Sequence, residues 1–363
     1  MKSFDEIFVD KTKYGVKVQT TEYGEVGEHI IIDQGQSQIA GYTDRQEGLF
    51  EEVPVVIFGD HTRVIKYVDE PFFLGADGVK VLRSKDDNAN YKYLYYALKN
   101  ARIPDTGYNR HFKWLKEVQI NYPDSDKQAE IVDILDNVSS VIKKREDELC
   151  VLDDLIKARF VEMFGDWIKE GGRPLSELAT ITGGLTKNSK REAFNLKMPY
   201  LRVANVFFNR LDLNEIQEIG IRKEEIDKTL LQKGDLLFVE GNGSIEQIGR
   251  VAIWDGSINP ILHQNHLIKA RFSVGIIIPE FALFYFMSQE GRQQIISKSV
   301  STSGLNTLSV NKIGSLILPV PPIILQEQFA DFVHQVDKSK VVVQKALDET
   351  QILFNSLMQQ YFG

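Results

Sequence analysis

The chain has 363 residues, 43% of them hydrophobic and 26% charged, a composition that is typical of folded domains and excludes a disordered chain. No stretch of about twenty apolar residues is present, and the first residues lack an apolar signal core. We therefore expect a cytoplasmic protein that neither spans a membrane nor is secreted. The net charge of -8 at pH 7 excludes a uniformly basic surface, so a basic surface for nucleic acid has to be local or supplied by a partner subunit.

Residues 1–122 form a first globular segment. Short apolar runs at residues 28–33, 53–58 and 78–82 are typical of strands, and clusters of glycine and aspartate separate them. The run YKYLYYALKN at residues 91–100 predicts an aromatic-rich helix. The segment therefore mixes strands with a helix.

The loop after this helix concentrates side chains that suit contact with nucleic acid. They are Arg102, Tyr108, Asn109, Arg110, His111 and Lys113. Cations beside an aromatic ring and an amide can contact phosphates and read base edges. The alternative, which composition alone favours, is a solvated loop whose tyrosine packs back onto the fold.

Residues 123–166 predict a long helix. Asp124 or Ser125 can cap its start, with Gln128 placed as in a capping box, and Gly165 suits its C-terminal end. An apolar stripe with a spacing of three or four residues runs along the helix. Its members are Ile131, Leu135, Val138, Ile142, Leu149, Leu152 and Ile156.

Residues 167–319 form a second globular segment. Residues 198–213 predict a strand that bears Arg202 and Asn205, followed by a turn with Asn209 and Arg210. The other predicted elements are two strands joined by a glycine-rich turn at 233–256, a strand at 261–272 and an aromatic helix at 276–296. The turn Gly241-Asn242-Gly243-Ser244 matches neither the phosphate-loop spacing nor GxGxxG. A hairpin or bulge is therefore the better interpretation of this turn.

Residues 320–363 predict a second long helix. Its apolar stripe consists of Phe329, Val333, Val336, Val343, Leu347, Phe354 and Leu357. At 1.5 Å per residue, each long helix measures roughly 60 Å. The two helices would bury their stripes most simply against each other.

The second helix repeats the first. A shift of about 198 positions aligns Gln128 with Gln326 and Phe164 with Phe362. The globular segments also share an outline, including a Gly-Xaa-Asn loop at residues 107–109 and 304–306. A match at so long a period indicates a duplicated module in the order globular segment, helix, globular segment, helix.

No arrangement of residues indicates catalysis or a metal site. His263 and His266 fall in a predicted strand, and no carboxylate or cysteine cluster completes a metal set, so both are interpreted as surface or loop histidines. Neither GxSxG nor a Cys/His nucleophile motif is present. Asp105 and Asp124, each after a proline, lack the Glu-Xaa-Lys that would indicate a nuclease. We predict a chain without catalytic or metal-binding residues.

Two stretches carry a family resemblance. LPVPPIILQEQFADFV (318–333) and VLDDLIKARFVEMFGD (151–166) closely resemble the conserved regions of the specificity (S, HsdS) subunit of type I restriction-modification systems. PYLRVANV (199–206) resembles a strand of that family's target-recognition domains. The alternation of variable and conserved segments matches along essentially the whole chain, although Pro123-Asp124 replaces the family's double proline.

The resemblance implies an α+β fold with an internal pseudo-twofold repeat. Two globular α/β target-recognition domains would be separated by a pair of long antiparallel helices that form a coiled-coil spacer. Each domain would read one half of a split site in double-stranded DNA. Two modification subunits carrying S-adenosylmethionine would methylate adenine, and restriction subunits would cleave with ATP and magnesium. The chain itself would be non-catalytic and hold no cofactor.

The first candidates for DNA contact lie in the loops that follow the aromatic helices, and further candidates lie elsewhere in each domain. In the first domain they are Tyr108, Asn109, Arg110, His111, Arg45, His61 and Arg63. In the second domain they are Ser301, Thr302, Ser303, Asn306, Lys187, Asn188, Lys190, Arg202, Asn242 and Gln264. One alternative is the recognition subunit of a related bipartite restriction system that cuts on both sides of its site. The neighbouring genes would distinguish the two systems. A coiled-coil scaffold for other proteins is a second alternative, which predicts no affinity for DNA.

Overall fold

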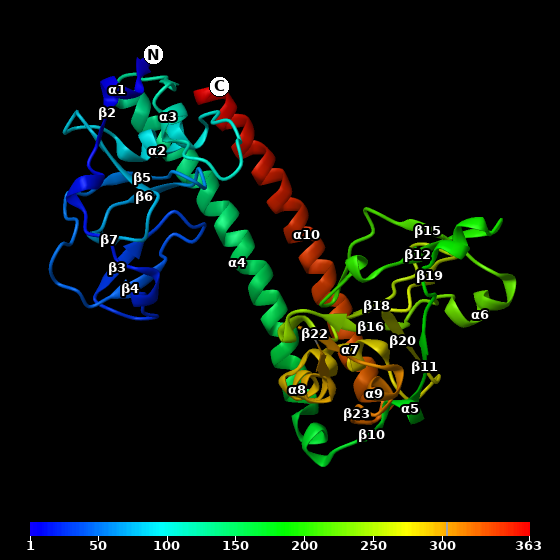
Figure 1. The fold of residues 1–363 in the computed structure, drawn as a ribbon. Helices are drawn as coiled ribbons and strands as arrows, with labels where there is room; N and C mark the ends of the chain where they lie inside the picture. The colour runs from blue at the N-terminus through cyan, green and yellow to red at the C-terminus, as the bar shows by residue number, and fades with distance from the viewer. Residues whose placement is uncertain (303) are drawn as a thin grey trace. The chain divides into compact units, whose positions relative to one another are not determined.

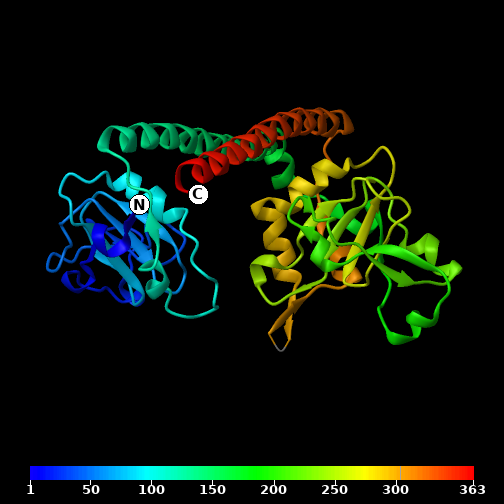
Figure 2. The ribbon, with the colours of Figure 1, turned by 90° about the horizontal axis from the view of Figure 1, so that it is seen from above.

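The computed structural model describes residues 1–302 and 304–363, with only the backbone at residue 302, and the chain divides into two compact units (Figure 1). Unit 1 comprises Met1–Asp147 and Gln344–Gly363, and unit 2 comprises Glu148–Val343. In each unit the sheets lie to one side of the long-helix segments (Figure 2).

Two long helices, α4 (Ser125–Glu170) and α10 (Ile323–Phe362), contribute to both units. The division falls after Asp147 in α4 and after Val343 in α10. The sequence predicted domain boundaries after residues 122, 166 and 319, at the ends of the helices. The compact units divide the chain differently, because each half-helix packs on the globular part of its own unit.

Unit 1 contains two sheets and a short strand pair. Its four-stranded antiparallel sheet has the order β2 (Phe8–Asp10), β8 (Val79–Ser84), β5 (Val55–Gly59) and β6 (Ile65–Val68). Its three-stranded sheet has the order β4 (Gly41–Thr43), β3 (His29–Ile32) and β7 (Phe72–Leu74), with β3 and β7 parallel. The strand pair is β1 (Lys2–Ser3) and β9 (Gln119–Ile120), and the helices before α4 are α1 (Phe4–Ile7), α2 (Tyr91–Lys99) and α3 (Phe112–Leu115).

Unit 2 repeats this arrangement. Its four-stranded antiparallel sheet has the order β11 (Ala179–Gly183), β20 (Leu267–Phe272), β16 (Leu236–Val239) and β18 (Val251–Ile253). Its three-stranded sheet has the order β15 (Gln217–Gly220), β12 (Lys197–Leu201) and β19 (Leu262–His263), with β12 and β19 parallel. The strand pair is β10 (Arg173–Pro174) and β23 (Ile317–Leu318). The α-helices that correspond to α1, α2 and α3 in chain order are α5 (Leu175–Leu178), α7 (Pro279–Met287) and α9 (Val310–Gly314).

Unit 2 also has elements of its own. They are the hairpin β13 (Val206–Phe207) and β14 (Arg210–Leu211), the sheet of β17 (Gly241–Asn242), β22 (Leu305–Thr307) and β21 (Val300–Thr302), and the helices α6 (Ile226–Thr229) and α8 (Gln289–Lys298). The shared strand orders confirm the predicted internal repeat and the α+β fold class.

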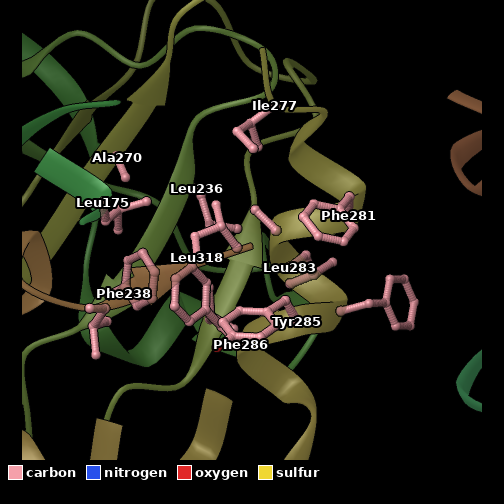
Figure 3. Packing of buried hydrophobic residues seen from close by; sticks show 14 of the residues in the cluster. Leu175, Leu236, Phe238, Ala270, Ile277, Phe281, Leu283, Tyr285, Phe286 and Leu318 are labelled. Atoms are coloured by element: carbon pink, nitrogen blue, oxygen red, sulfur yellow. The ribbon is translucent and has the colours of Figure 1, made fainter. Parts of the chain in front are cut away.

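The core of unit 2 lies between the four-stranded sheet and α7 (Figure 3). Phe238 of β16 meets Phe286 of α7 with ring centroids 5.2 Å apart, and Leu236 lies beside them. On the opposite side of α7, Phe281 contacts Phe164 of α4 with ring centroids 4.7 Å apart. The sequence of α7 is apolar nearly all round, and the sheet and the long helices bury it from both sides.

The long helices pack in opposite directions within each unit. In unit 2, Phe160 of α4 contacts Phe329 of α10 at a ring-centroid distance of 5.4 Å, while Asp153, earlier on α4, pairs with Lys340, later on α10 (2.6 Å). In unit 1 the hydrophobic core joins Ile131 and nearby residues of α4 to residues late in α10. Most members of the predicted stripes lie in these two cores. Buried members are Ile131, Leu135, Ile156, Phe329, Val333, Val336, Val343 and Phe354, and half-buried members are Val138, Ile142, Leu149, Leu152, Leu347 and Leu357.

The start of α4 was predicted correctly, but its end was not. The carboxylate of Asp124 accepts the backbone N–H of Lys127 (2.9 Å), which caps the helix. Gly165 lies inside the helix, which continues to Glu170. Gly171, with φ +93°, takes the left-handed position past the helix end that the sequence assigned to Gly165.

Two predicted strands are interrupted. The strand predicted to bear Arg202 and Asn205 ends at Leu201, where the backbone N–H of Arg202 donates to the Asn205 side chain (2.8 Å) and the chain turns into a 3-10 helix. The strand predicted at 261–272 is divided by a turn in which the Leu267 N–H donates to the Gln264 carbonyl (2.9 Å). Both interruptions are local hydrogen-bonded turns that a strand pattern does not reveal.

The helix predicted at 276–296 is two helices. Ser288 adopts an extended conformation between α7 and α8, and its hydroxyl accepts the N–H of Gly291. This serine cap begins a new helix axis. Among the helices that the structure describes, none is both long and apolar enough to cross a membrane.

Candidate nucleic-acid interface

The candidate residues of unit 1 gather where β5 ends. Asp60 follows this strand, and its carbonyl accepts the backbone N–H of His111 (2.8 Å). Its carboxylate accepts the N–H of Phe112 (2.8 Å). These bonds fix the loop of residues 101–111 to the end of the sheet, next to His61.

His111 belongs to the interior and not to the surface. Its side chain is fully buried, and its Nδ1 lies 3.0 Å from the Asp60 carbonyl. We predicted a DNA contact for His111, and its burial corrects that interpretation. The residue holds the loop in place.

Tyr108 is the most exposed ring of the loop. It is 87% exposed and stacks on His61 with ring centroids 4.7 Å apart and an angle of 9° between the planes. Asn109 places its carbonyl 3.2 Å from Nδ1 of His61, while its own amide is committed to Thr106. The tip of the loop is therefore a preformed aromatic surface, and Asn109 shapes it.

Arg63 braces the same loop. Its guanidinium pairs with the carboxylate of Asp105 (2.7 Å). The pKa of the Asp105 carboxyl is lowered first by the hydrogen bond from the Gly107 N–H and then by Arg63. Arg63 has a φ of 61°, a left-handed conformation that costs an arginine free energy. Gly249, at the corresponding turn of unit 2, has the same φ without that cost.

Two remaining candidates of unit 1 differ in place. Arg110 is exposed and lies near Asp77, whose carboxyl pKa is lowered chiefly by Lys17 and also by Arg110 and His61. Arg45 pairs with Glu22 (3.2 Å) beside the start of β3, at the opposite end of its sheet from the loop. The structure therefore brings Arg110 to the candidate interface but not Arg45.

The corresponding strand ends of unit 2 gather four candidates. Arg202 follows β12, and Gln264 follows β19 with its N–H donating to the Leu201 carbonyl (2.9 Å). Asn242 lies in β17, just beyond the end of β16, and pairs with Asn306 in β22. Asn306 is 9% exposed, and its amide donates to the carbonyls of residues 242 and 243, so it orders the turn.

The other candidates of unit 2 lie around this end. Lys187, Asn188 and Lys190 are exposed, on a segment that begins where Leu185 bridges to Gln264. Ser301 is exposed and pairs with Asn306 across the hairpin. The backbone of Thr302 belongs to β21, and Ser303 lies outside the described residues.

His263 was predicted to lie at the surface or in a loop, and this is wrong. The side chain is fully buried, its Nδ1 lies 2.8 Å from the Thr229 carbonyl, and burial lowers the pKa of its ring to about 4. His266 is exposed, as predicted, with its Nδ1 2.7 Å from Glu240. Within the part of the chain that the structure describes, no group of three His, Cys, Asp or Glu side chains is placed to hold a metal.

Sequence reasoning missed the two anchoring acids. Asp60 follows β5 and Glu240 follows β16, and the carbonyl of Glu240 accepts the N–H of Leu308 (2.8 Å) as that of Asp60 accepts His111. The signal was available, because an acidic residue closely follows the apolar strand in both copies of the repeat. Each unit thus presents the same strand end with a loop fastened to it.

The chain matches a family of known proteins. Residues 9–150 and 172–350 match the family model of the type I restriction modification DNA specificity domain. The chain is 23% identical over 354 residues to the type I restriction enzyme EcoR124I/EcoR124II specificity subunit of Escherichia coli, covering 90% of this chain and 83% of the relative.

Other relatives are matched over part of their length. The EcoKI specificity subunit of Escherichia coli strain K12 is 29% identical over 51% of this chain, a match that spans only 39% of that relative.

The fold is similar to the crystal structure of the type-I restriction-modification system S subunit from M. genitalium, with a TM-score of 0.55, 16% identity and coverage of 100% of this chain and 95% of that one.

The buried histidine gives a pH prediction for unit 2. Its folded-state pKa of about 4 is below the ordinary value of 6.5, so the unfolded state binds a proton that the folded state does not. Stability should therefore fall as the pH drops from about 6.5 to about 4, by on the order of 3 kcal/mol. Denaturant unfolding followed by the fluorescence of buried Trp254, with Trp114 and Trp167 replaced by phenylalanine, measures this.

The matched control for this prediction is His263→Gln, which keeps a donor for the Thr229 carbonyl and does not titrate. The variant should lose less stability than the parent over the same pH range. Equal losses in the two proteins would show that other groups cause the pH dependence.

Proposed function

Because the chain belongs to the type I restriction modification DNA specificity family, we propose that it is the DNA-recognition subunit of such a system. The observation that carries this proposal is the duplicated strand end. Each unit fastens one loop with exposed polar side chains to the acid that follows its central strand, and the loop of unit 1 adds the exposed ring of Tyr108. Two related readers in one chain suit a site made of two separate half-sequences.

We assign one half-site to each unit. Direct reading of bases needs side chains that reach groove edges from a rigid support. In unit 1 the exposed groups on that support are Tyr108 and Arg110. In unit 2 they are the half-buried Gln264 and the exposed cations Lys187 and Lys190. Asn109, Asn306 and His111 support the loops through the hydrogen bonds described above.

The long helices would set the distance between the half-sites. Both helices run without interruption from one unit into the other, which makes each of them a continuous α-helical connection. A DNA turn of about 34 Å is shorter than either helix at 1.5 Å per residue. The gap between the half-sites would therefore depend on helix length and not on the recognition loops.

Catalysis would belong to partner subunits. We propose that two modification subunits, with S-adenosylmethionine, methylate adenine at the site, and that restriction subunits supply cleavage with ATP and magnesium. The net charge of -8 supports this division, because partners would provide much of the phosphate contact. A recognition subunit of a related bipartite system shares the same chemistry and differs in its partners.

Mapping of methylated adenines tests the proposal. In a genome that carries this gene with its partner subunits, we expect a split motif with one methylated adenine on each strand, and none when this gene is deleted. A continuous motif would contradict the assignment of one half-site to each unit. Absence of DNA binding by the assembled complex would favour the protein-scaffold alternative.

The spacer is tested by lengthening both helices together. One heptad inserted after Asp147 and one after Val343 adds about 10 Å. We expect the gap in the methylated motif to grow by about three base pairs while both half-site sequences stay the same. Insertion of seven residues into a single helix is the control, since it should disrupt packing. A changed half-site with a constant gap would refute the spacer role.

The half-site assignment is tested with two reciprocal variants. Tyr108→Ala should weaken binding by about 1–3 kcal/mol and relax one position of one half-site, because it removes the exposed ring from the unit 1 loop. Gln264→Ala should relax a position in the other half-site only. Methylation mapping with randomised half-sites reads both effects. Relaxation of the same half-site by both variants would be inconsistent with one reader per unit.

A further inference from the structure

The hairpin of β13 and β14 in unit 2 carries a cluster of arginines and phenylalanines. The guanidinium of Arg210 lies over the Phe207 ring at 4.3 Å, and that of Arg250 lies over the same ring at 5.2 Å. The guanidinium of Arg292 lies over Phe208 at 4.9 Å. Two neighbouring rings of one hairpin thus hold three cations by cation–π contact.

This cluster adjoins the candidate interface of unit 2. The N–H of Asn209, at the hairpin turn, donates to the carbonyl of Val251 (2.9 Å), which fixes the hairpin to the start of β18. Arg250 immediately precedes β18, and its Nη2 donates to the carbonyl of Val203 (3.3 Å). Val203 follows Arg202, one of the candidate DNA contacts. The hairpin therefore borders the strand ends where these contacts gather.

The three cations lack compensating carboxylates. Other arginines of unit 2 form ion pairs, such as Arg202 with Glu215 (3.0 Å) and Arg271 with Asp235 (2.7 Å). Among the residues that the structure describes, none of the arginines of the hairpin cluster has a carboxylate oxygen within 4.0 Å. In a chain with a net charge of -8, this is a local concentration of positive charge.

The three arginines differ in how freely they can bind a ligand. Arg292 donates to the carbonyls of Ile248 (2.8 Å) and Glu246 (3.1 Å), so the fold uses its guanidinium. Burial lowers the pKa of Arg250, whose Nε is enclosed without a hydrogen-bond partner among the described residues. Arg210 is exposed, and no hydrogen bond from its guanidinium to another described residue is formed.

We propose that Arg210, stacked on Phe207 beside Arg250, contacts a backbone phosphate of the DNA next to the half-site that unit 2 reads. This rests on the proposed function and adds a residue to it. A guanidinium stacked on a ring keeps its N–H edge free for bidentate contact with phosphate oxygens. Arg250 over the same ring and Arg292 over the neighbouring ring strengthen attraction to a polyanion without distinguishing bases. The hairpin therefore positions the duplex, and the neighbouring strand ends read it.

The salt dependence of binding tests this assignment in the complex assembled with its modification subunits. Arg210→Ala should weaken binding to the specific site and to unrelated duplex by the same factor, about threefold to tenfold at 0.1 M salt. The slope of log affinity against log salt should become shallower by about 0.9, so the difference from wild type shrinks by about threefold between 50 and 200 mM salt. The methylated motif should not change.

Two matched variants sharpen the test. Arg210→Lys keeps the charge and should restore most of the salt slope. Arg173→Ala removes an exposed arginine of unit 2 that already pairs with Glu177 (3.1 Å), and it should leave the slope unchanged. Because Arg210 and Arg173 are both exposed, all three variants should unfold at nearly the wild-type temperature.

Each result separates this inference from the proposed function. An unchanged salt slope for Arg210→Ala, in a complex whose wild-type form methylates a split site, overturns the phosphate contact alone. Relaxed selectivity at one base overturns it in favour of base reading. A wild-type complex that binds no DNA refutes the proposed function itself.

Discussion

Each globular part depends on packing against a segment of long helix that belongs to the other copy of the sequence repeat. In unit 1 the ring of Phe362, from α10, contacts Tyr93 of α2 with centroids 5.2 Å apart. In unit 2 the repeat-related Phe164, from α4, contacts Phe281 of α7. Because α7 is apolar nearly all round, it needs a partner on the side away from its sheet. The exchange of half-helices between the two copies supplies that partner.

Two glutamines that the sequence repeat aligns make the same contact in both copies. The side chain of Gln128 donates to the carbonyl of Pro123 (2.8 Å), and that of Gln326 donates to Pro321 (2.8 Å), each five residues before the glutamine. Both side chains are buried, where an unpaired amide would cost free energy. The same polar contact at the start of both long helices fixes how the chain enters each helix from the preceding strand.

The sequence was most informative where structure depends on near neighbours. The cap at Asp124, the aromatic helix at 91–100 and the stripes of the long helices follow from local patterns. The burial of His111 does not, because it depends on Asp60, which is 51 residues away. The apolar pattern did not reveal the break at Ser288, because the break depends on a hydrogen bond. The hydroxyl of this serine accepts the N–H of Gly291 and so begins a new helix.

The candidate interface shows the same limit. Sequence composition identified the loops with polar and cationic side chains, and the structure brings most of them to two equivalent strand ends. Sequence composition could not separate exposed side chains, such as Tyr108, from side chains that order the turn, such as Asn306. That distinction depends on hydrogen bonds between strands far apart in the chain. The sequence also does not indicate that Arg210, Arg250 and Arg292, which are far apart in the chain, gather on one hairpin.

The division of the long helices has a consequence for synthesis. Unit 2 is one continuous stretch, Glu148–Val343, so all of its parts have been translated once that stretch is complete. Unit 1 is discontinuous and lacks Gln344–Gly363 until the ribosome reaches the end of this sequence. Domains commonly complete folding in the order in which they are made. In this protein the later-made unit is the first to have all of its residues, and the part of the α2 surface that α10 contacts stays uncovered until the end of α10 is made.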